Sequence, residues 1–222
     1  MSFLLQIDTA LSIATVSFSE QGTLKFSLQN TDIKQHASFV QPAIRSLMKS
    51  NHISWDDVDA VCVNAGPGSY TGLRVGLAAA KGIAFALDKP LITINGLEVI
   101  ALQAILNEND ANAFYIPMID ARRMEVFCGI YDYALKPVAE PSPMVLSAGI
   151  FEKYENQKQI FCGNGAAKFQ SIYTGNNALF IPADNTLNAL SKLCFRNLCN
   201  GHFDSVTDAV PQYLKEFYNG YT

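Results

Sequence analysis

One order of strand-like and helix-like segments occurs twice along the chain. Strand-like segments are short apolar or alternating runs, whereas helix-like segments repeat their apolar residues about every 3.6 positions. In the first half, three strands precede a helix, and two further strand–helix pairs follow. The expected strands are residues 3–8, 13–19, 23–29, 58–63 and 91–94, and the expected helices are residues 39–48, 71–87 and 97–106. Pro42 within the first helical stripe predicts a late helix start or a kink.

The second half repeats this order. Its expected strands are residues 114–119, 125–131, 137–146, 159–162 and 179–181, and its expected helices are residues 147–154, 166–172 and 187–198. Gly201 follows the last helix as a stop signal. The polar stretch 107–112 lies between the halves. We therefore expect two domains, residues 1–106 and 107–222.

Three antiparallel strands followed by strand–helix crossovers are typical of ribonuclease-H-like domains. Two such lobes facing one another are typical of actin, hexokinase and the heat-shock ATPases. The order β-β-β-α-β-α-β-α, found twice, predicts an α/β protein with the actin-like ATPase (ASKHA) architecture.

Charge is scarce in this chain. Charged residues make up 16% of it, against about 25% in an average soluble domain. Either part of the surface is buried against another chain, or uncharged polar residues cover it. The net charge of −4 and the scattered basic residues argue against a protein that binds nucleic acid by itself.

The chain carries no signal of export or membrane insertion. Its five cysteines form no CxxC pair, which suits a reducing compartment. No signal-peptide pattern precedes the first strand, and no apolar run reaches membrane-spanning length. We expect a soluble, cytoplasmic protein without a membrane partner.

A glycine-rich loop lies between an expected strand and the helix 71–87. Its candidate anion-binding residues are Gly66, Gly68 and Ser69, because a glycine-rich turn before a helix attracts phosphate. The loop lacks the Lys of a Walker motif. The alternative is a tight turn whose Ser caps the helix. Gly163 and Gly165 occupy the matching position in the second half, where an ordinary turn is again the alternative.

Asp8 and Asp120 each end the first strand of their half. Paired acids at strand ends can hold a metal–nucleotide complex, so Asp8, Thr9 and Asp120 are candidate nucleotide-binding residues. Ala10 and Leu11, however, occupy the position of the usual phosphate turn. We therefore expect weak ATP or ADP binding at best, and no obligatory cofactor. The alternative is that each aspartate only caps the turn that follows it.

The sequence offers no catalytic group in a known arrangement. The three histidines lie far apart, whereas a transition-metal site needs several convergent ligands. There is no Gly-x-Ser-x-Gly elbow for a nucleophile. We predict no catalytic residue and no metal site.

Several segments together resemble a known family. The run Asn-Ala-Gly-Pro-Gly-Ser-Tyr-Thr-Gly-Leu-Arg-Val-Gly at 64–76 closely resembles the TsaB (YeaZ) family, the accessory subunits of bacterial threonylcarbamoyl-adenosine (t6A) tRNA modification. Further similar segments are residues 80–87, 4–9, 119–126 and 211–215. The match is dense in the first half and patchy after residue 131.

The resemblance implies a role without catalysis. The related enzyme TsaD, formerly called a glycoprotease, carries a metal-binding His-x-x-x-His where this chain has Gly96 and Ile100. A non-catalytic scaffold is thus implied, with a TsaD-like catalytic subunit and a TsaE-like P-loop ATPase as partners. A homodimer is implied when the chain is alone, and tRNA contact only through the complex. A small-molecule kinase or ATPase on the same fold is the alternative, and a metallopeptidase is disfavoured.

The helix 71–87 is unusually apolar. Its most polar stripe holds Arg74, Ala78, Lys81 and Phe85, which share a face by helical spacing. Such a helix either contacts another chain or is buried within its own lobe. We predict an intermolecular contact at these four residues.

Overall fold

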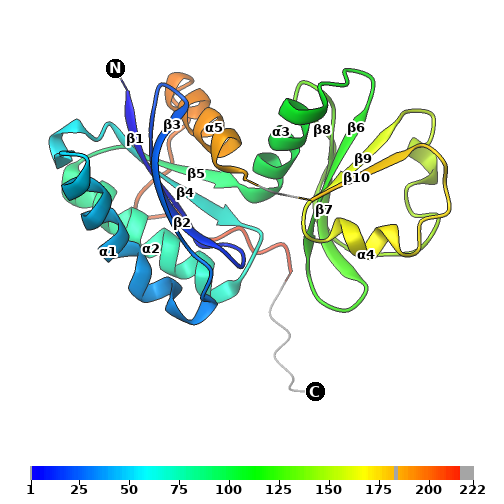
Figure 1. Cartoon of the computed structure of the whole chain (residues 1–222), viewed down its shortest axis with the longest axis horizontal. Coiled ribbons are helices and arrows are strands. Elements are labelled where there is room, and N and C mark those ends of the chain that lie inside the picture. The colour runs from blue at the N-terminus through cyan, green and yellow to red at the C-terminus, as the bar shows by residue number, and fades with distance from the viewer. Residues whose placement is uncertain (1, 183–184, 216–222) are drawn as a thin grey trace. The chain divides into compact units, whose positions relative to one another are not determined.

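The computed structural model describes residues 2–182 and 185–215. The chain divides into two compact units (Figure 1). Unit 1 comprises residues 1–99 and 185–212, and unit 2 comprises residues 100–184 and 213–222. No helix in the described ranges is long and apolar enough to cross a membrane.

Unit 1 is built on a five-stranded sheet of order β3-β2-β1-β4-β5. Its elements are β1 (Phe3–Asp8), β2 (Ala14–Glu20), β3 (Thr23–Asn30), α1 (His36–Ser50), β4 (Ala60–Gly66), α2 (Tyr70–Leu87), β5 (Leu91–Asn95) and α5 (Leu187–Cys199). Strand β1 pairs antiparallel with β2 and parallel with β4. Short 3-10 turns η1 (Ile33–Gln35) and η2 (Trp55–Asp57) flank α1.

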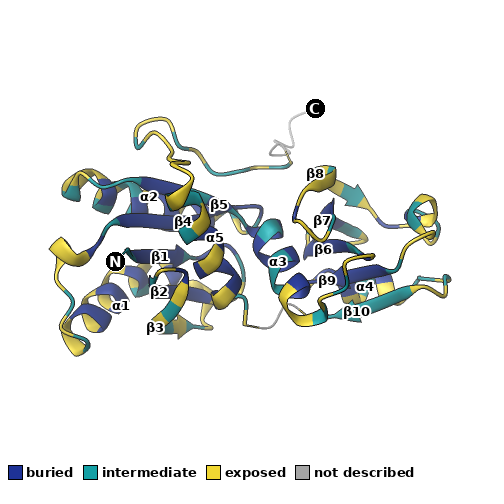
Figure 2. Ribbon diagram, turned by 90° about the horizontal axis from the view of Figure 1, so that it is seen from above, coloured by how far each residue is buried: buried dark blue, intermediate teal, exposed yellow. Residues whose placement is uncertain are grey.

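Successive side chains of β1 point to opposite faces of this sheet, and different helices cover the two faces. Leu5 and Ile7 join the apolar core with side chains of α1 and α2, such as Ile44 and Leu77. Gln6 points to the other face, where its Oε1 accepts hydrogen bonds from Ser17 Oγ at 2.8 Å and Ser191 Oγ of α5 at 3.2 Å. The central strands β1, β2 and β4 are therefore covered on both faces, as Figure 2 shows by their burial, whereas the edge strand β3 is partly exposed.

Unit 2 repeats the same topology. Its sheet has the order β10-β9-β6-β7-β8, which read in reverse places each strand at the position of its equivalent in unit 1. Its elements are α3 (Gly96–Glu108, which begins in unit 1), β6 (Phe114–Asp120), β7 (Glu125–Tyr131), β8 (Pro137–Val145), β9 (Gln159–Cys162), α4 (Ala166–Gln170) and β10 (Ala178–Ile181). The predicted pair of ribonuclease-H-like lobes with the actin-like architecture is confirmed.

The core of unit 2 is aromatic. Phe151, Phe161, Phe169, Tyr173 and Phe180 contact one another with ring centroids mostly 4.8 to 5.9 Å apart. Such ring pairs stabilise a core beyond the area that they bury.

The expected helix at 147–154 is wrong. This segment is a series of turns that ends in the 3-10 turn η3 (Glu152–Tyr154). Amides bond to carbonyls three residues back, as from Ile150 to Ser147 and from Glu152 to Gly149. Gly149 disfavours a regular helix, and the turns bring Phe151 between Phe161 and Phe169. Pro42 lies inside α1, which already begins at His36, so the late helix start predicted from this proline is wrong.

Helix α5 belongs to unit 1, although a second domain at 107–222 would include it. Its buried face includes Leu187, Leu190 and Leu193, and Phe195 lies against Gly22 of the β2–β3 turn. Residues 185–212 thus complete the first unit, whereas residues from Ile100 onward in α3 group with the second.

A strap at residues 203–212 follows α5 along unit 1. Asp204 forms an isolated bridge with Leu91 and accepts the Thr93 amide at 2.7 Å. The Gln212 amide donates to the Ala65 carbonyl at 2.7 Å. Lys81 Nζ of α2 donates to the strap carbonyls of Thr207 and Ala209 at 3.1 and 3.0 Å. The strap therefore occupies this lysine.

Candidate functional site

The glycine-rich loop of unit 1 packs directly on the turn that follows β1. The Ser69 amide donates to the Ala10 carbonyl at 2.7 Å, and Thr9 Oγ1 donates to the Gly72 carbonyl at 2.6 Å. Ser69 also caps α2, since its Oγ accepts the Gly72 amide at 3.3 Å. Thr9 and Ala10 are completely buried. The Ser69 amide and the Thr9 hydroxyl, two groups expected to face a phosphate, are thus bonded within the lobe.

Each glycine of the loop admits a neighbouring backbone. A Cβ at Gly68 would overlap the Ala10 carbonyl, and one at Gly72 would overlap the Thr9 carbonyl. Gly66 has φ of +126°, and a Cβ there would lie 2.8 Å from the Gln212 carbonyl oxygen of the strap. Close backbone approach accounts for these glycines without a ligand.

Asp8 is held at the end of β1 by two donors. Its carboxylate accepts the Ala10 amide and Asn64 Nδ2, each at 3.0 Å. Burial raises the pKa of Asp8 above its usual value, although these hydrogen bonds and His36 favour the ionised form. His36 is itself buried, and its Nε2 has no hydrogen-bond partner among the described residues. This carboxylate forms part of an internal polar cluster.

Positions 96 and 100 carry no side chain that can ligate a metal. Gly96 begins α3, and a Cβ there would lie 3.0 Å from the Asn64 side-chain amide. Ile100 is 4% exposed in an apolar environment. Over residues 2–182 and 185–215, no three His, Cys, Asp or Glu side chains converge on a possible metal site.

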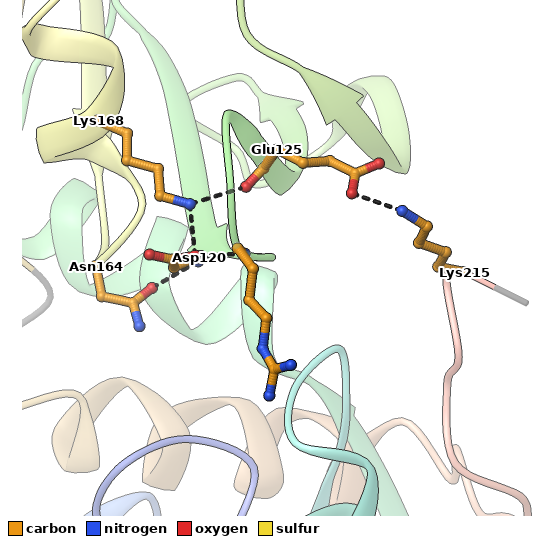
Figure 3. Close-up of polar contacts among 6 residues, drawn as sticks. Asp120, Glu125, Asn164, Lys168 and Lys215 are labelled. Carbon is orange, nitrogen blue, oxygen red and sulfur yellow. Dashed lines mark hydrogen bonds and ion pairs between the residues drawn. The ribbon is translucent and has the colours of Figure 1, made fainter. Parts of the chain in front are cut away.

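The second candidate carboxylate lies in a more open arrangement in unit 2 (Figure 3). The Asp120 amide donates to Asn164 Oδ1 at 3.0 Å. Asp120 Oδ1 accepts the Arg122 amide and Lys168 Nζ, each at 2.6 Å. Lys168 also donates to the Glu125 carbonyl at 3.3 Å, and Lys215 pairs with the Glu125 carboxylate at 2.6 Å.

The charge state of Asp120 follows from these contacts. Partial burial alone would raise its pKa, but the hydrogen bonds from Lys168 and the Arg122 amide outweigh burial and lower it. Asp120 is therefore ionised at neutral pH and already paired with a cation. It stabilises the β6–β7 turn, as the turn-capping alternative expects.

The glycines of unit 2, like those of unit 1, allow a neighbouring backbone to approach closely. Gly163 has φ of +104°, and a Cβ there would overlap the Met118 carbonyl. The Gly165 amide donates to that same carbonyl at 2.9 Å. The structure thus places Asp120 near Gly163 and Gly165, and Asp8 near Gly66, Gly68 and Ser69, as two clusters on separate units.

Three residues of these clusters were missed in the sequence. Asn64 lies within β4 and donates to the Asp8 carboxylate, whereas Asn164 follows β9 and accepts the Asp120 backbone amide. The glycine spacing does not pair the two asparagines, because Asn64 lies two residues before Gly66 whereas Asn164 lies one residue after Gly163. Lys168 of α4 gives no sequence signal of its role.

The outward face of α2 is largely apolar. Phe85 is 77% exposed, and Thr71, Arg74, Ala78, Gly82 and Ala86 are exposed on the same helix. The Arg74 guanidinium lies 3.9 Å from the ring centre of Tyr70. The alternative that the whole helix is buried in its own lobe is excluded for Phe85.

We predict that Gly72→Ala destabilises the isolated chain by about 2–4 kcal/mol, because the new methyl group overlaps a backbone carbonyl that cannot rotate away. Gly82→Ala is the matched control on the same helix. No atom lies within 4 Å of a Cβ at Gly82, so this change should stabilise by about 0.5–1 kcal/mol. Urea unfolding followed by circular dichroism measures both, and equal stabilities would contradict the packing role.

We predict that Asp120→Asn destabilises the chain by about 0.5–1 kcal/mol at pH 7, since the ion pair with Lys168 is partly exposed. The lowered pKa of Asp120 makes this contribution present above the usual value of 3.8 and lost as pH falls through the folded value. Wild type and variant should therefore converge in urea titrations as the pH falls below the lowered folded pKa of Asp120. Asp56→Asn is the control, and a difference that persists at low pH would refute the assignment.

Comparisons with known proteins identify the family of this chain. The model of the family TsaD, tRNA N6-adenosine threonylcarbamoyltransferase, matches residues 30–217. The tRNA threonylcarbamoyladenosine biosynthesis protein TsaB of Bacillus subtilis is 30% identical over 165 residues, which cover 72% of this chain and 70% of that protein. TsaB of Escherichia coli is 30% identical over 128 residues, which cover 58% of this chain and 54% of the relative.

A solved structure shows the same fold over most of the chain. YeaZ from Pseudomonas aeruginosa superposes with a TM-score of 0.79 at 24% identity, and the match covers 96% of this chain and 100% of that one. The family model and the Bacillus relative each span most of the sequence. The chain belongs to the TsaB (YeaZ) family, within the wider group that includes TsaD.

Proposed function

We propose that this chain is a non-catalytic subunit in the synthesis of threonylcarbamoyladenosine on tRNA, and that it docks on a TsaD-like catalytic subunit through α2. The proteins named TsaB to which it is similar support the pathway. The observation that carries the docking is the exposed face of α2, where Phe85 is 77% exposed. A large aromatic group on an apolar face is a typical anchor of a protein interface.

The environment of positions 96 and 100 supports the absence of catalysis. An imidazole at 96 would displace the Asn64 amide that holds Asp8, and position 100 lies in the apolar core. The metal-dependent chemistry then belongs to the partner. The present chain contributes a surface, and a TsaE-like ATPase joins the same complex.

The α2 face also accounts for self-association. Arg74, Ala78 and Phe85 lie on the exposed side of the helix, whereas Lys81 is engaged by the strap. Small residues such as Ala78 and Gly82 let a second helix approach closely. In the absence of the catalytic partner, a second copy covers this face as a homodimer.

A kinase or ATPase is the disfavoured alternative. It requires backbone and hydroxyl donors that point to a phosphate, but the Ser69 amide and the Thr9 hydroxyl are bonded within the lobe. Any binding of ATP or ADP by the isolated chain is therefore weak, and no cofactor is required.

We predict that Phe85→Asp abolishes assembly with the TsaD-like subunit and weakens the homodimer, because a buried unpaired carboxylate opposes the contact. The melting temperature should stay close to that of the wild type, since Phe85 already faces solvent. Val145→Asp is the matched control, as Val145 is 66% exposed on β8 of unit 2. Sizing chromatography with light scattering, alone and with the partner, measures both associations.

Two results would contradict the docking proposal. A Phe85→Asp variant that still forms the complex excludes α2 as the interface. A variant that melts far below the wild type shows that the side chain supports the lobe instead. Failure of the wild-type chain to bind any TsaD-like subunit removes the proposed function itself.

We predict that calorimetry with Mg-ATP gives a dissociation constant of about 100 µM or weaker, which corresponds to about −5.5 kcal/mol. The reason is the closed packing of the glycine-rich loop on Thr9 and Ala10. Asp8→Asn serves as the comparison variant. Sub-micromolar binding that this substitution abolishes would support the kinase alternative.

A further inference from the structure

The turn between β6 and β7, residues 120–125, carries two adjacent arginines in an unusual backbone conformation. Arg122 has φ of +69° and Arg123 has φ of +49°. The left-handed region is disfavoured for long side chains and favoured for Gly and Asn. Residues kept in such conformations concentrate at functional sites. We call this segment the arginine turn.

The framework of the arginine turn is braced by polar contacts. The Ala121 amide bonds to the Glu125 carbonyl at 3.1 Å, and the Glu125 amide bonds to the Arg122 carbonyl at 3.1 Å. Asp120 is fixed by Asn164 and Lys168, as Figure 3 shows. The backbone that presents the two guanidinium groups is thus held from several sides.

The arginine side chains themselves are left available. Both residues are exposed, and neither guanidinium forms an ion pair with any described residue. The two neighbouring lysines are instead neutralised, Lys168 by Asp120 and Lys215 by Glu125. The turn therefore presents two unneutralised positive charges on a chain whose net charge is −4.

We propose that the arginine turn binds the phosphate backbone of tRNA in the assembled complex. This inference rests on the proposed function, which supplies tRNA as the substrate of the complex. A guanidinium matches a phosphate with two parallel hydrogen bonds, and two adjacent guanidinium groups can span neighbouring phosphates.

The chemistry around the turn favours RNA over a protein partner. The centre of a protein interface is depleted of charge and holds apolar anchors, as the α2 face does. The arginine turn is surrounded by Asp120, Glu125, Lys168 and Lys215, and Met124, 40% exposed, is its large apolar side chain. The overall net charge of −4 disfavours RNA binding by this chain alone, so the inference places the binding in the complex.

The test is tRNA binding by the reconstituted complex of this chain with its TsaD-like and TsaE-like partners. The variant Arg122→Asn/Arg123→Gly removes both guanidinium groups and supplies residues that suit the left-handed conformation. We expect about tenfold weaker binding of labelled tRNA, with the salt slope reduced by about one for each lost phosphate contact. The melting temperature should equal or exceed that of the wild type.

Two further variants separate charge from geometry. Lys136→Gln/Lys153→Gln removes the same charge from exposed positions elsewhere in unit 2 and should leave tRNA affinity nearly unchanged. Arg122→Lys/Arg123→Lys keeps the charge but loses the paired hydrogen bonds, so its affinity should lie between those of the wild type and the uncharged variant. Anisotropy titrations between about 50 and 200 mM salt measure all of these.

The outcomes distinguish this inference from the proposed function. Unchanged tRNA affinity of the uncharged variant in an intact complex overturns the inference alone. Loss of complex formation in that variant also overturns it, because the turn would then contact a protein. A wild-type chain that does not assemble with the partners refutes the proposed function and, with it, the inference.

Discussion

The architecture of unit 1 depends on one backbone contact, between the turn after β1 and the start of α2. The carbonyls of Thr9 and Ala10 approach Gly72 and Gly68 so closely that any side chain would overlap them. The hydrogen bond from the Ser69 amide to the Ala10 carbonyl closes the contact. A loop that resembles a phosphate cradle in sequence packs on the protein itself, because the Thr9 and Ala10 carbonyls fill the space at its glycines and the Ser69 amide and Thr9 hydroxyl bond within the lobe.

The two lobes share this plan but differ in the state of their aspartates. Asp8 lies in an internal cluster where burial raises its pKa, whereas Asp120 is paired with Lys168 and has a lowered pKa. In each lobe an asparagine, Asn64 or Asn164, bonds the residue that ends the first strand. Both lobes therefore hold the end of the first strand by a hydrogen bond to an asparagine, but the two carboxylates differ in their burial and in their charged partners.

Periodicity predicted most of the elements because each strand and helix here is a local pattern. It could not assign α5 to a sheet, since an amphipathic helix does not specify which apolar surface it covers. That assignment depends on contacts such as Gln6 with Ser191, 185 residues apart. The segment 147–154 failed for a related reason, because Phe151 is drawn into an aromatic core that only the folded unit assembles. The roles of Lys81 and Lys168 likewise depend on distant carbonyls and carboxylates.

The structure shows where the few charged side chains of this chain lie and what they contact. Most described cations near the candidate sites are engaged: Lys81 by strap carbonyls, Lys168 and Lys215 by carboxylates, and Arg74 by the Tyr70 ring. The exposed face of α2 is consequently apolar and suited to a protein partner. Arg122 and Arg123 are exposed without such engagement, on a backbone that disfavours long side chains. On a chain with few charges, two adjacent arginines that form no ion pair with any described residue remain available to an external anion.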